Sequence, residues 1–487
     1  MSQNPSSSGL NIVGQKAKTS TVPVVSAKEF AGNASIITLG CSKNLVDSEV
    51  MLGALASRGF QSVPDPENAD IIVVNTCAFL ESAVEESIDR ILEVSELKAR
   101  GRCRQLVVAG CMVERYREQL VAELPEVDQF ISTDELLKVG QSAETSVECF
   151  DKARRPYFIY DENAPRVRST GKAWTYLKIS EGCDRPCTFC IIPKIRGSFR
   201  SRSIASIEAE ASSLLADGVR ELNLIAQDLT AYGTDFEGGR GIKSALPELL
   251  KRIDAINSAE EFWVRLFYAY PVGTTEALIN QLTELRNVCA YLDIPLQHIS
   301  HPVLKAMQRP LGEKGTRRLI EMIRTKAPRL ALRTTFIVGF PGETEEDVAA
   351  LEAFVREGHF MHVGVFTYSH ESEAAAAKLD GQLSEELKQQ RRDRIMLAQQ
   401  EVLKTKLESF VGSRQKVLLL GAHSDTDSLL VGRTEFQGPE ADGETIINDV
   451  AAELGELDWS QLGGRFAEVE ITEIAGYDLV GTLVGLS

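Results

Sequence analysis

The sequence predicts an α/β chain in three parts: an N-terminal parallel α/β domain, a partial (βα)6 barrel, and a small all-β barrel at the C-terminus. Three observations support this fold class. Apolar, strand-length runs alternate with helix-like stretches in the first part, and six further strand–helix units fill the middle. After a polar helix, the chain changes to short strands separated by Gly, Pro and Asp. A length of 487 residues suits about three domains.

The first part begins with a segment that we expect to be a flexible tail, residues 1–34, because it is rich in Ser, Asn, Ala and Thr and lacks periodicity. We assign residues 35–150 to the N-terminal domain. Its three β-branched runs are residues 35–39, 71–74 and 106–109, each followed by a helix-like stretch. Repeated units of this kind form a parallel sheet.

The middle part, residues 165–400, follows a polar linker around residues 161–170. Its strand candidates are residues 174–180, 221–226, 263–268, 291–294, 332–338 and 362–367. A full barrel of this type has eight strand–helix units, so six units predict a barrel that is open on one side.

The third part, residues 402–487, follows a polar helix expected over residues 385–409. Its strand candidates are residues 415–420, 429–432, 444–447, 467–471 and 479–484. Their short length and the Gly, Pro and Asp turns between them predict a small all-β barrel.

The composition is that of a globular protein, with 43% hydrophobic and 25% charged residues. The sequence has no apolar run of about 18 residues, which excludes a membrane-spanning helix. The N-terminus has no basic start followed by an apolar stretch, so we expect no secretory signal and a cytoplasmic location. A net charge of −17 argues against generic nucleic-acid binding and suits a basic partner.

The nine cysteines are an odd number, which disfavours a disulfide framework and favours metal ligation or catalysis. Cys103, Cys149 and Cys289 belong to no cluster, and we expect them to be small buried apolar residues.

Three cysteines each follow a predicted strand: Cys41, Cys77 and Cys111. The carboxyl ends of parallel strands share one edge of a sheet, so these thiols should converge. Each also precedes a helix, whose N-terminus favours a thiolate, the form that iron–sulfur clusters need. Zinc is a weaker alternative because a structural site normally has four protein ligands, and three unrelated buried cysteines are the remaining alternative.

The second set is Cys183, Cys187 and Cys190, in a Cys-x3-Cys-x2-Cys loop after the first barrel strand. Three thiolates can hold three irons of a cubane cluster and leave the fourth iron open for a small molecule. A structural zinc would need a fourth ligand, and no Cys or His lies within twenty residues on either side. Zinc or a plain loop is therefore the weaker alternative.

These features resemble the radical S-adenosylmethionine (SAM) methylthiotransferase family over nearly the whole chain after the tail. The stretch from Gly182 to Gly197 is similar to the core signature of the family, and the first three cysteines match the ligands of its N-terminal domain. The C-terminal barrel resembles a TRAM domain. The resemblance implies two [4Fe–4S] clusters and SAM, with one SAM used for methyl transfer and one for a 5′-deoxyadenosyl radical.

Two branches of the family compete, one acting on an adenosine in transfer RNA and the other on the β-carbon of an aspartate in small-subunit ribosomal protein twelve. Residues 39–49, 439–443 and 477–479 resemble the ribosomal-protein branch, with Ser42 and Ala441 as minor departures. Residues 412–487 contain 14 Asp plus Glu against 4 Lys plus Arg, a balance of −10. This balance would repel RNA and attract a basic ribosomal protein, although acidity also serves solubility alone.

Three residues are candidate SAM contacts. Phe189 lies inside the cysteine loop and could stack on adenine, or simply pack. Gln227 follows a barrel strand together with Asp228, and Gly339 lies in a glycine turn where the backbone could approach a ligand. No catalytic side chain is assigned.

The predicted function is therefore methylthiolation of ribosomal protein twelve, with transfer-RNA methylthiolation as the alternative. A non-enzymatic iron–sulfur scaffold and a zinc-binding interaction protein are further alternatives. We expect a monomer that receives electrons from a donor such as flavodoxin or ferredoxin and has no membrane partner.

Overall fold

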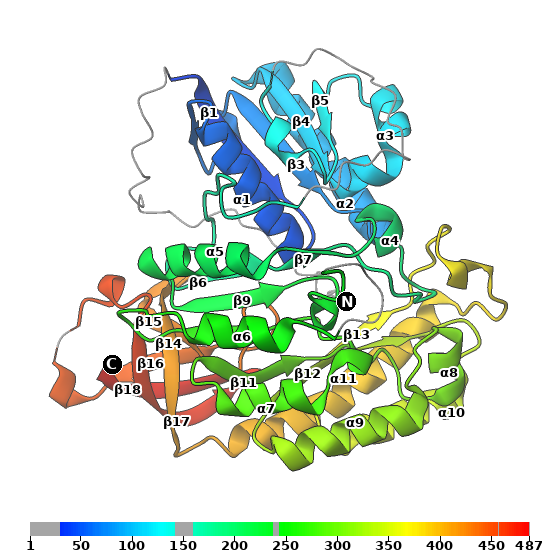
Figure 1. The fold of residues 1–487 in the computed structure, drawn as a ribbon, viewed down its shortest axis with the longest axis vertical. Helices are drawn as coiled ribbons and strands as arrows, with labels where there is room; N and C mark the ends of the chain where they lie inside the picture. The colour runs from blue at the N-terminus through cyan, green and yellow to red at the C-terminus, as the bar shows by residue number, and fades with distance from the viewer. Residues whose placement is uncertain (1–29, 142–158, 237–242, 456, 487) are drawn as a thin grey trace, which may run out of the picture. The chain divides into compact units, whose positions relative to one another are not determined.

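A computed structural model of the chain describes residues 30–141, 159–236, 243–455 and 457–486 (Figure 1). The chain forms two compact units. The first comprises residues 1–169 together with 181–183 and 191–198, and the second comprises residues 170–180, 184–190 and 199–487. Most of the predicted tail and Cys149 lie outside the described residues.

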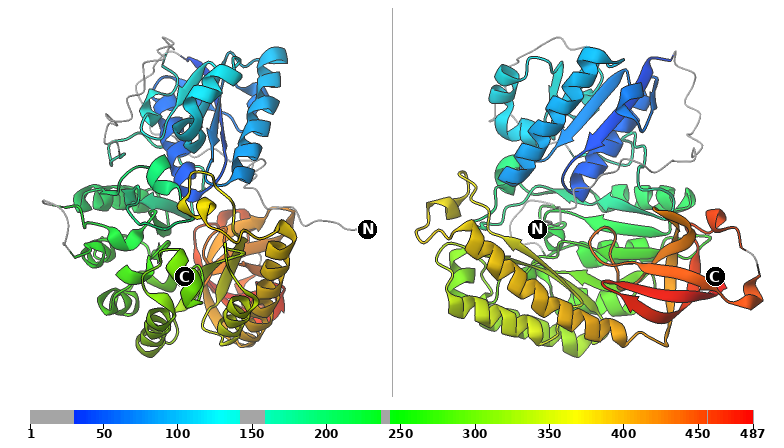
Figure 2. Two further views of the ribbon diagram at one scale, coloured as in Figure 1. Left: turned by 90° about the vertical axis from the view of Figure 1, so that its right-hand side faces the viewer. Right: turned by 180° about the vertical axis from the view of Figure 1, so that it is seen from behind.

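The first unit is built on a five-stranded parallel sheet in the order β2-β1-β3-β4-β5. Its strands are β1 (Gly32–Thr38), β2 (Phe60–Ser62), β3 (Ile71–Thr76), β4 (Gln105–Gly110) and β5 (Gln129–Ile131). Its main helices are α1 (Ser42–Ala56), α2 (Glu81–Arg100) and α3 (Cys111–Glu123). Helix α1 connects β1 to β2 in one direction along the sheet, and the later helices connect β3, β4 and β5 in the opposite direction. Because such connections are right-handed, helices lie on both faces of the sheet (Figure 2).

The three predicted strands of this sheet are confirmed, and β2 and β5 were missed. Both missed strands are three residues long with mostly half-buried or exposed side chains, so they lack the apolar run that marks β3, in which all six residues are buried.

The second unit contains a six-stranded parallel sheet in the order β13-β12-β11-β10-β9-β6, open between its two end strands. The strands are β6 (Trp174–Lys178), β9 (Glu221–Ile225), β10 (Trp263–Leu266), β11 (Val288–Asp293), β12 (Ala331–Val338) and β13 (His362–Thr367). The main helices are α5 (Ile204–Ala216), α6 (Leu246–Asp254), α7 (Glu276–Glu284), α9 (Gly312–Lys326) and α10 (Glu345–Arg356). This confirms the predicted partial (βα)6 barrel.

The remaining short elements flank the cysteine loop and the sheet. They are β7 (Ser180–Glu181), β8 (Arg200–Ser201), α4 (Ile192–Ile195) and α8 (His301–Ala306).

The C-terminal part follows α11 (Glu385–Glu408) and is a closed barrel in the order β14-β15-β16-β18-β17. Its strands are β14 (Arg414–His423), β15 (Thr426–Thr434), β16 (Thr445–Val450), β17 (Phe466–Ala475) and β18 (Asp478–Leu486). The predicted all-β barrel is confirmed. Most of its strands extend beyond the predicted bounds. Their ends carry polar, exposed residues, which the apolar pattern used for the prediction does not include.

The connection between β15 and β16 packs against the inner face of the six-stranded sheet, within the second unit. Leu222 and Leu224 of β9 face the helices, so the alternating residue Glu221 faces inward. Glu221 accepts hydrogen bonds from Arg433 (2.6 Å) and from Arg265 of β10 (2.7 Å). Further bonds join Tyr291 to Asp442, Tyr176 to Glu440, and His362 to the Phe436 carbonyl, each 2.8 Å long.

Among the described helices, none combines the length and apolar character needed to cross a bilayer.

Candidate active site

Cys41, Cys77 and Cys111 lie at the carboxyl ends of three neighbouring strands of the first unit. Cys41 caps α1 and follows β1 by three residues, Cys77 directly follows β3, and Cys111 is the first residue of α3 after β4. The structure therefore confirms the predicted placement of these cysteines after strands.

A glycine with a positive φ angle directly precedes two of these cysteines, Cys41 and Cys111. Gly40 has φ +91°, and a Cβ atom there would lie 3.0 Å from the Cys77 sulfur. Gly110 has φ +96°, and a Cβ atom there would lie 2.3 Å from the Asn75 side-chain oxygen. The space around the thiols thus depends on residues without side chains.

The three thiols interact with one another. Burial raises the pKa of the Cys77 thiol to about 11, and the Cys41 thiol adds to this rise. Burial likewise raises the pKa of the Cys111 thiol to about 12, with contributions from Cys77 and Cys41. Burial, the largest cause at both Cys77 and Cys111, acts against the thiolate that the helix N-termini are expected to favour. Metal binding would itself displace these protons.

Asn44 of α1 is fully buried and links the ends of the strands. Its amide nitrogen donates to the carbonyls of Leu39 and Thr76, each at 2.9 Å, and its amide oxygen accepts from the Cys111 thiol at 3.6 Å. Residues 39–49, which include Asn44, were identified from the sequence only by their resemblance to the ribosomal-protein branch of the family. Asn44 is one of several buried polar residues of α1, so no local pattern distinguishes it.

The second cysteine set is divided between the units. Cys183 belongs to the first unit and is buried, and its N–H donates to the Gly197 carbonyl (3.2 Å). Gly182, with φ +78°, has no room for a side chain, since a Cβ atom would lie 2.2 Å from the Ser198 carbonyl oxygen.

Cys187 and Cys190 belong to the second unit and are half-buried. The Cys190 N–H donates to the Cys187 carbonyl (3.1 Å), which makes a tight turn between them. Arg309 donates to the Cys187 sulfur at 3.7 Å. A hydrogen bond to a ligating sulfur is one of the means by which proteins tune iron–sulfur clusters.

Two guanidinium groups stack on Tyr270 next to this turn. The Arg185 guanidinium carbon lies 4.3 Å from the Tyr270 ring centroid and that of Arg309 lies 4.4 Å from it. Arg185 also donates to the buried carboxylate of Asp228 at 2.7 Å. The same carboxylate accepts from the Thr230 N–H at 3.0 Å, so the arginine is held by a side chain that is itself fixed. The sequence did not single out Arg185, Tyr270 or Arg309.

The predicted SAM contacts lie in the second unit, and each has an observed packing environment. Phe189 packs against an apolar cluster that includes Met307 and Phe340. Gln227 is half-buried, two residues after β9 ends. Gly339 has φ +73°, and a Cβ atom there would lie 2.3 Å from the Lys388 side chain. Their contact with SAM stays a prediction.

Among the residues that the structure describes, no three His, Cys, Asp or Glu side chains converge closely enough to hold one metal ion. Cys103 and Cys289 are buried, as predicted.

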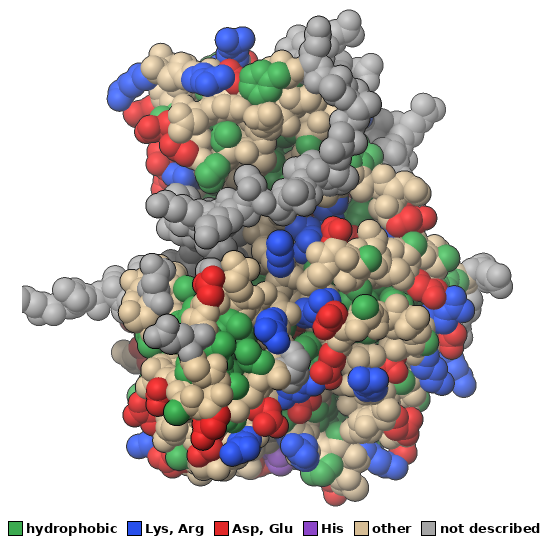
Figure 3. Space-filling view, turned by 90° about the vertical axis from the view of Figure 1, so that its left-hand side faces the viewer, with side chains coloured by type: hydrophobic (Ala, Val, Ile, Leu, Met, Phe, Trp, Pro, Cys, Tyr) green, Lys and Arg blue, Asp and Glu red, His purple; other side chains and the backbone are tan. Residues whose placement is uncertain are grey.

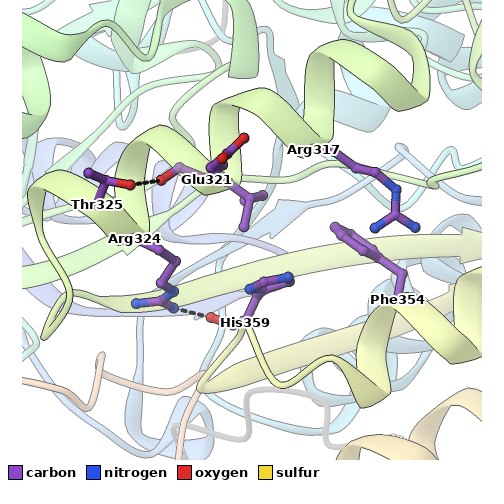
Figure 4. A pocket seen from close by; sticks show the side chains of 7 residues that line it. Arg317, Glu321, Arg324, Thr325, Phe354 and His359 are labelled. Carbon is purple, nitrogen blue, oxygen red and sulfur yellow. Dashed lines mark hydrogen bonds between the residues drawn. The ribbon is translucent and has the colours of Figure 1, made fainter.

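A cavity of about 420 Å³ in the second unit contains none of the predicted site residues. It lies beside α9, between Arg317, Phe354 and His359 (Figure 4). Arg324 in its wall donates to the carbonyls of Leu330 (2.7 Å) and His359, and burial lowers the pKa of its guanidinium to about 10. This arginine holds loops together, which is a structural role.

The acidic surplus of the C-terminal barrel is only partly on the surface. Glu435, Glu440 and Asp442 bond to the six-stranded sheet. In this barrel, the exposed carboxylates among the described residues are Asp425, Glu440, Asp449, Glu453, Asp458, Glu468 and Glu473. The face of the molecule in Figure 3 carries acidic and basic side chains interspersed.

Comparison with known families supports this organisation. An uncharacterized protein family, UPF0004, matches residues 33–132, the radical SAM superfamily matches residues 177–355, and the TRAM domain matches residues 411–484. A solved structure of the radical SAM methyltransferase TsrM from Kitasatospora setae has the same fold, with a TM-score of 0.51 at 15% identity over 71% of this chain and 76% of that chain.

The chain is also similar to curated proteins along most of its length. It is 46% identical over 447 residues to a protein of Anaeromyxobacter sp. (strain K), covering 92% of each chain. It is 42% identical to a protein of Geobacter sulfurreducens, covering 92% of this chain and 98% of the relative. Both relatives are named ribosomal protein uS12 methylthiotransferase RimO. This extent of similarity shows that the chain belongs to the RimO family, within the radical SAM superfamily.

Proposed function

We propose that the chain transfers a methylthio group to the β-carbon of an aspartate in ribosomal protein uS12. The observation that carries this proposal is the identity of 42–46% to relatives named uS12 methylthiotransferases, over 92% of the chain. The sites support it, because the chain gathers one cysteine trio at the edge of a sheet and carries the Cys-x3-Cys-x2-Cys loop of the radical SAM part.

Radical SAM membership implies a [4Fe–4S] cluster and SAM, which we assign to Cys183, Cys187 and Cys190. We assign a second [4Fe–4S] cluster to Cys41, Cys77 and Cys111. The residues fit this group: three mutually interacting thiols lie where Gly40 leaves room, and the nearby Ser42 hydroxyl is buried with no hydrogen-bond partner among the described residues.

When bound, these cofactors supply the radical that removes an unactivated hydrogen and the methylated sulfur that replaces it. The β-carbon C–H bond of aspartate is too weakly acidic for a side-chain base, so the residues of the chain act by positioning. Asn44 holds the ends of β1 and β3 together and contacts Cys111. Arg309 donates a hydrogen bond to the Cys187 sulfur. Asp228 accepts a hydrogen bond from Arg185, which stacks on Tyr270.

The acidic C-terminal barrel suits a basic ribosomal protein as substrate, through complementary charge. Its exposed carboxylates outnumber its exposed cations, Arg414, Lys416 and Arg465, and this balance opposes binding of transfer RNA. The proposal includes a cytoplasmic location and an external electron donor such as flavodoxin or ferredoxin.

Anaerobic iron analysis tests the cofactor assignment. We expect about eight irons per chain, falling to about four in Cys41/Cys77/Cys111→Ala and to about four in Cys183/Cys187/Cys190→Ala, because each cubane cluster holds four irons. Wild-type protein with four irons or fewer, or zinc in their place, would contradict it.

Mass spectrometry of a deletion strain tests the substrate. Ribosomal protein uS12 should lose the mass of one CH₂S unit, and the chain supplied on a plasmid should restore it. Loss of the same unit from a transfer-RNA nucleoside, with uS12 unchanged, would support the transfer-RNA alternative instead.

A further inference from the structure

Arg196 is a buried cation in the first unit, at the end of α4. The residue is 3% exposed. Its guanidinium donates to the Asp47 carboxylate at 2.6 Å, to the Glu181 carboxylate at 3.4 Å, and to the Asn44 amide oxygen. Asp47 and Asn44 both lie on α1, about 150 residues away in the sequence. An arginine from the cysteine-loop region is therefore built into the helix that follows Cys41.

Arg196 connects ligands of both cysteine sets through short paths. On one side, the neighbouring Gly197 carbonyl accepts the N–H of Cys183 at 3.2 Å. On the other side, the Asn44 oxygen that Arg196 contacts also accepts from the Cys111 thiol at 3.6 Å. All of these residues belong to the first compact unit, so the connection lies within one body.

The charge of Arg196 acts on the first cysteine trio. Burial by itself would lower the pKa of the guanidinium, but Cys111, Asp47, Glu181 and Cys41 together raise it well above its ordinary value. Reciprocally, Arg196 opposes the rise that burial causes in the pKa of the Cys111 thiol. A buried cation is costly unless anions pair with it, and here Asp47 and Glu181 pair with Arg196 directly while the Cys111 and Cys41 thiols also favour its charged form.

We propose that Arg196 is a positioning residue that sets the reduction potential of the cluster assigned to Cys41, Cys77 and Cys111. The inference rests on the proposed function, since it requires that second cluster. Reduction adds negative charge to a cluster, and a fixed positive charge nearby favours the reduced form and raises the potential. Asp47 should have the opposite effect, because its carboxylate disfavours the added charge.

The test measures the potential of this cluster alone, in full-length Cys183/Cys187/Cys190→Ala protein reconstituted with iron and sulfide under anaerobic conditions. Electron paramagnetic resonance follows the reduced cluster during a redox titration. We expect Arg196→Gln to lower the potential by about 59 mV, a tenfold change in a one-electron equilibrium, and Asp47→Asn to raise it by a similar amount. Arg196→Lys keeps the charge and should stay close to the parent protein.

The outcomes separate the inference from the function on which it rests. A parent protein without about four irons contradicts the proposed second cluster. With the cluster present, an unchanged potential in Arg196→Gln, or shifts of the same sign in Arg196→Gln and Asp47→Asn, overturns the inference and leaves the function standing. Loosened packing would move both variants the same way. If Arg196→Gln does not retain iron, Asp47→Asn alone provides the test. A raised potential in Asp47→Asn supports the inference, and an unchanged or lowered potential overturns it.

Discussion

Replacing Glu221 by glutamine should lower the free energy of unfolding of the second unit more than breaking an exposed ion pair would. The Glu221 side chain is fully buried and bonds to two buried guanidinium groups, those of Arg265 and Arg433. Burial alone would raise the pKa of this carboxyl, but Arg433 and Arg265 outweigh it and hold the pKa below 4.5. The glutamine variant keeps the shape of the side chain and leaves both cations without their anion.

Removing one partner from a buried ion pair costs about 3–5 kcal/mol, because an uncompensated charge stays in the interior. Glu470→Gln is the matched control. Glu470 faces Arg414 at 3.7 Å on the surface, where both side chains are largely exposed, and such a pair contributes about 0–1 kcal/mol.

Equilibrium urea unfolding with tryptophan fluorescence measures the difference, since Trp174, Trp263 and Trp459 all belong to the second unit. The stabilising effect of Glu221 should be complete above about pH 4.5 and should decline as the pH falls below that value, because the pKa is lower in the folded state. A Glu221→Gln variant within about 1 kcal/mol of wild type at pH 7, like the control, would refute the reasoning.

Three further predictions concern the cysteines and their surroundings. Gly40→Ala should reduce the iron content of the reconstituted protein, whereas Gly218→Ala should not: the two glycines share nearly the same φ, +91° and +92°, but nothing lies within 4 Å of a Cβ at Gly218. Equal iron loss in both would show that backbone strain, not the space near the thiols, matters. Arg309→Gln should lower the reduction potential of the cluster on the loop that contains Cys187, measured by redox titration in protein lacking the first trio, because a donor to sulfur is lost. Cys289 should resist iodoacetamide in the folded chain at pH 8, followed by peptide mass spectrometry, because burial raises the pKa of its thiol to about 12; rapid labelling would contradict this.

The sequence predicted the elements that carry long apolar runs. All six strands of the open sheet were found because each carries an apolar run of strand length. In the first unit, parallel topology placed Cys41, Cys77 and Cys111 at the carboxyl ends of neighbouring strands. The strands β2 and β5 are only three residues long and lack that signal. Local pattern and topology thus predicted the architecture and the placement of the first trio after neighbouring strands.

The polar network around the cysteines could not be predicted in the same way. The partners of Arg196 are set by tertiary packing between segments about 150 residues apart, and no local period marks them. The thiol pKa values also depend on burial, which raises the pKa of Cys77 and of Cys111 and which no local sequence pattern reports.

The end of β15 and the connection from β15 to β16 limit how this protein can be recombined with its relatives. Arg433, Glu440 and Asp442 each bond to a specific partner on the six-stranded sheet. A chimera that exchanges only the C-terminal barrel would therefore separate matched pairs and leave charges without counterions in the interior. Swaps intended to redirect substrate choice should carry Tyr176, Glu221 and Tyr291 along with the transplanted barrel.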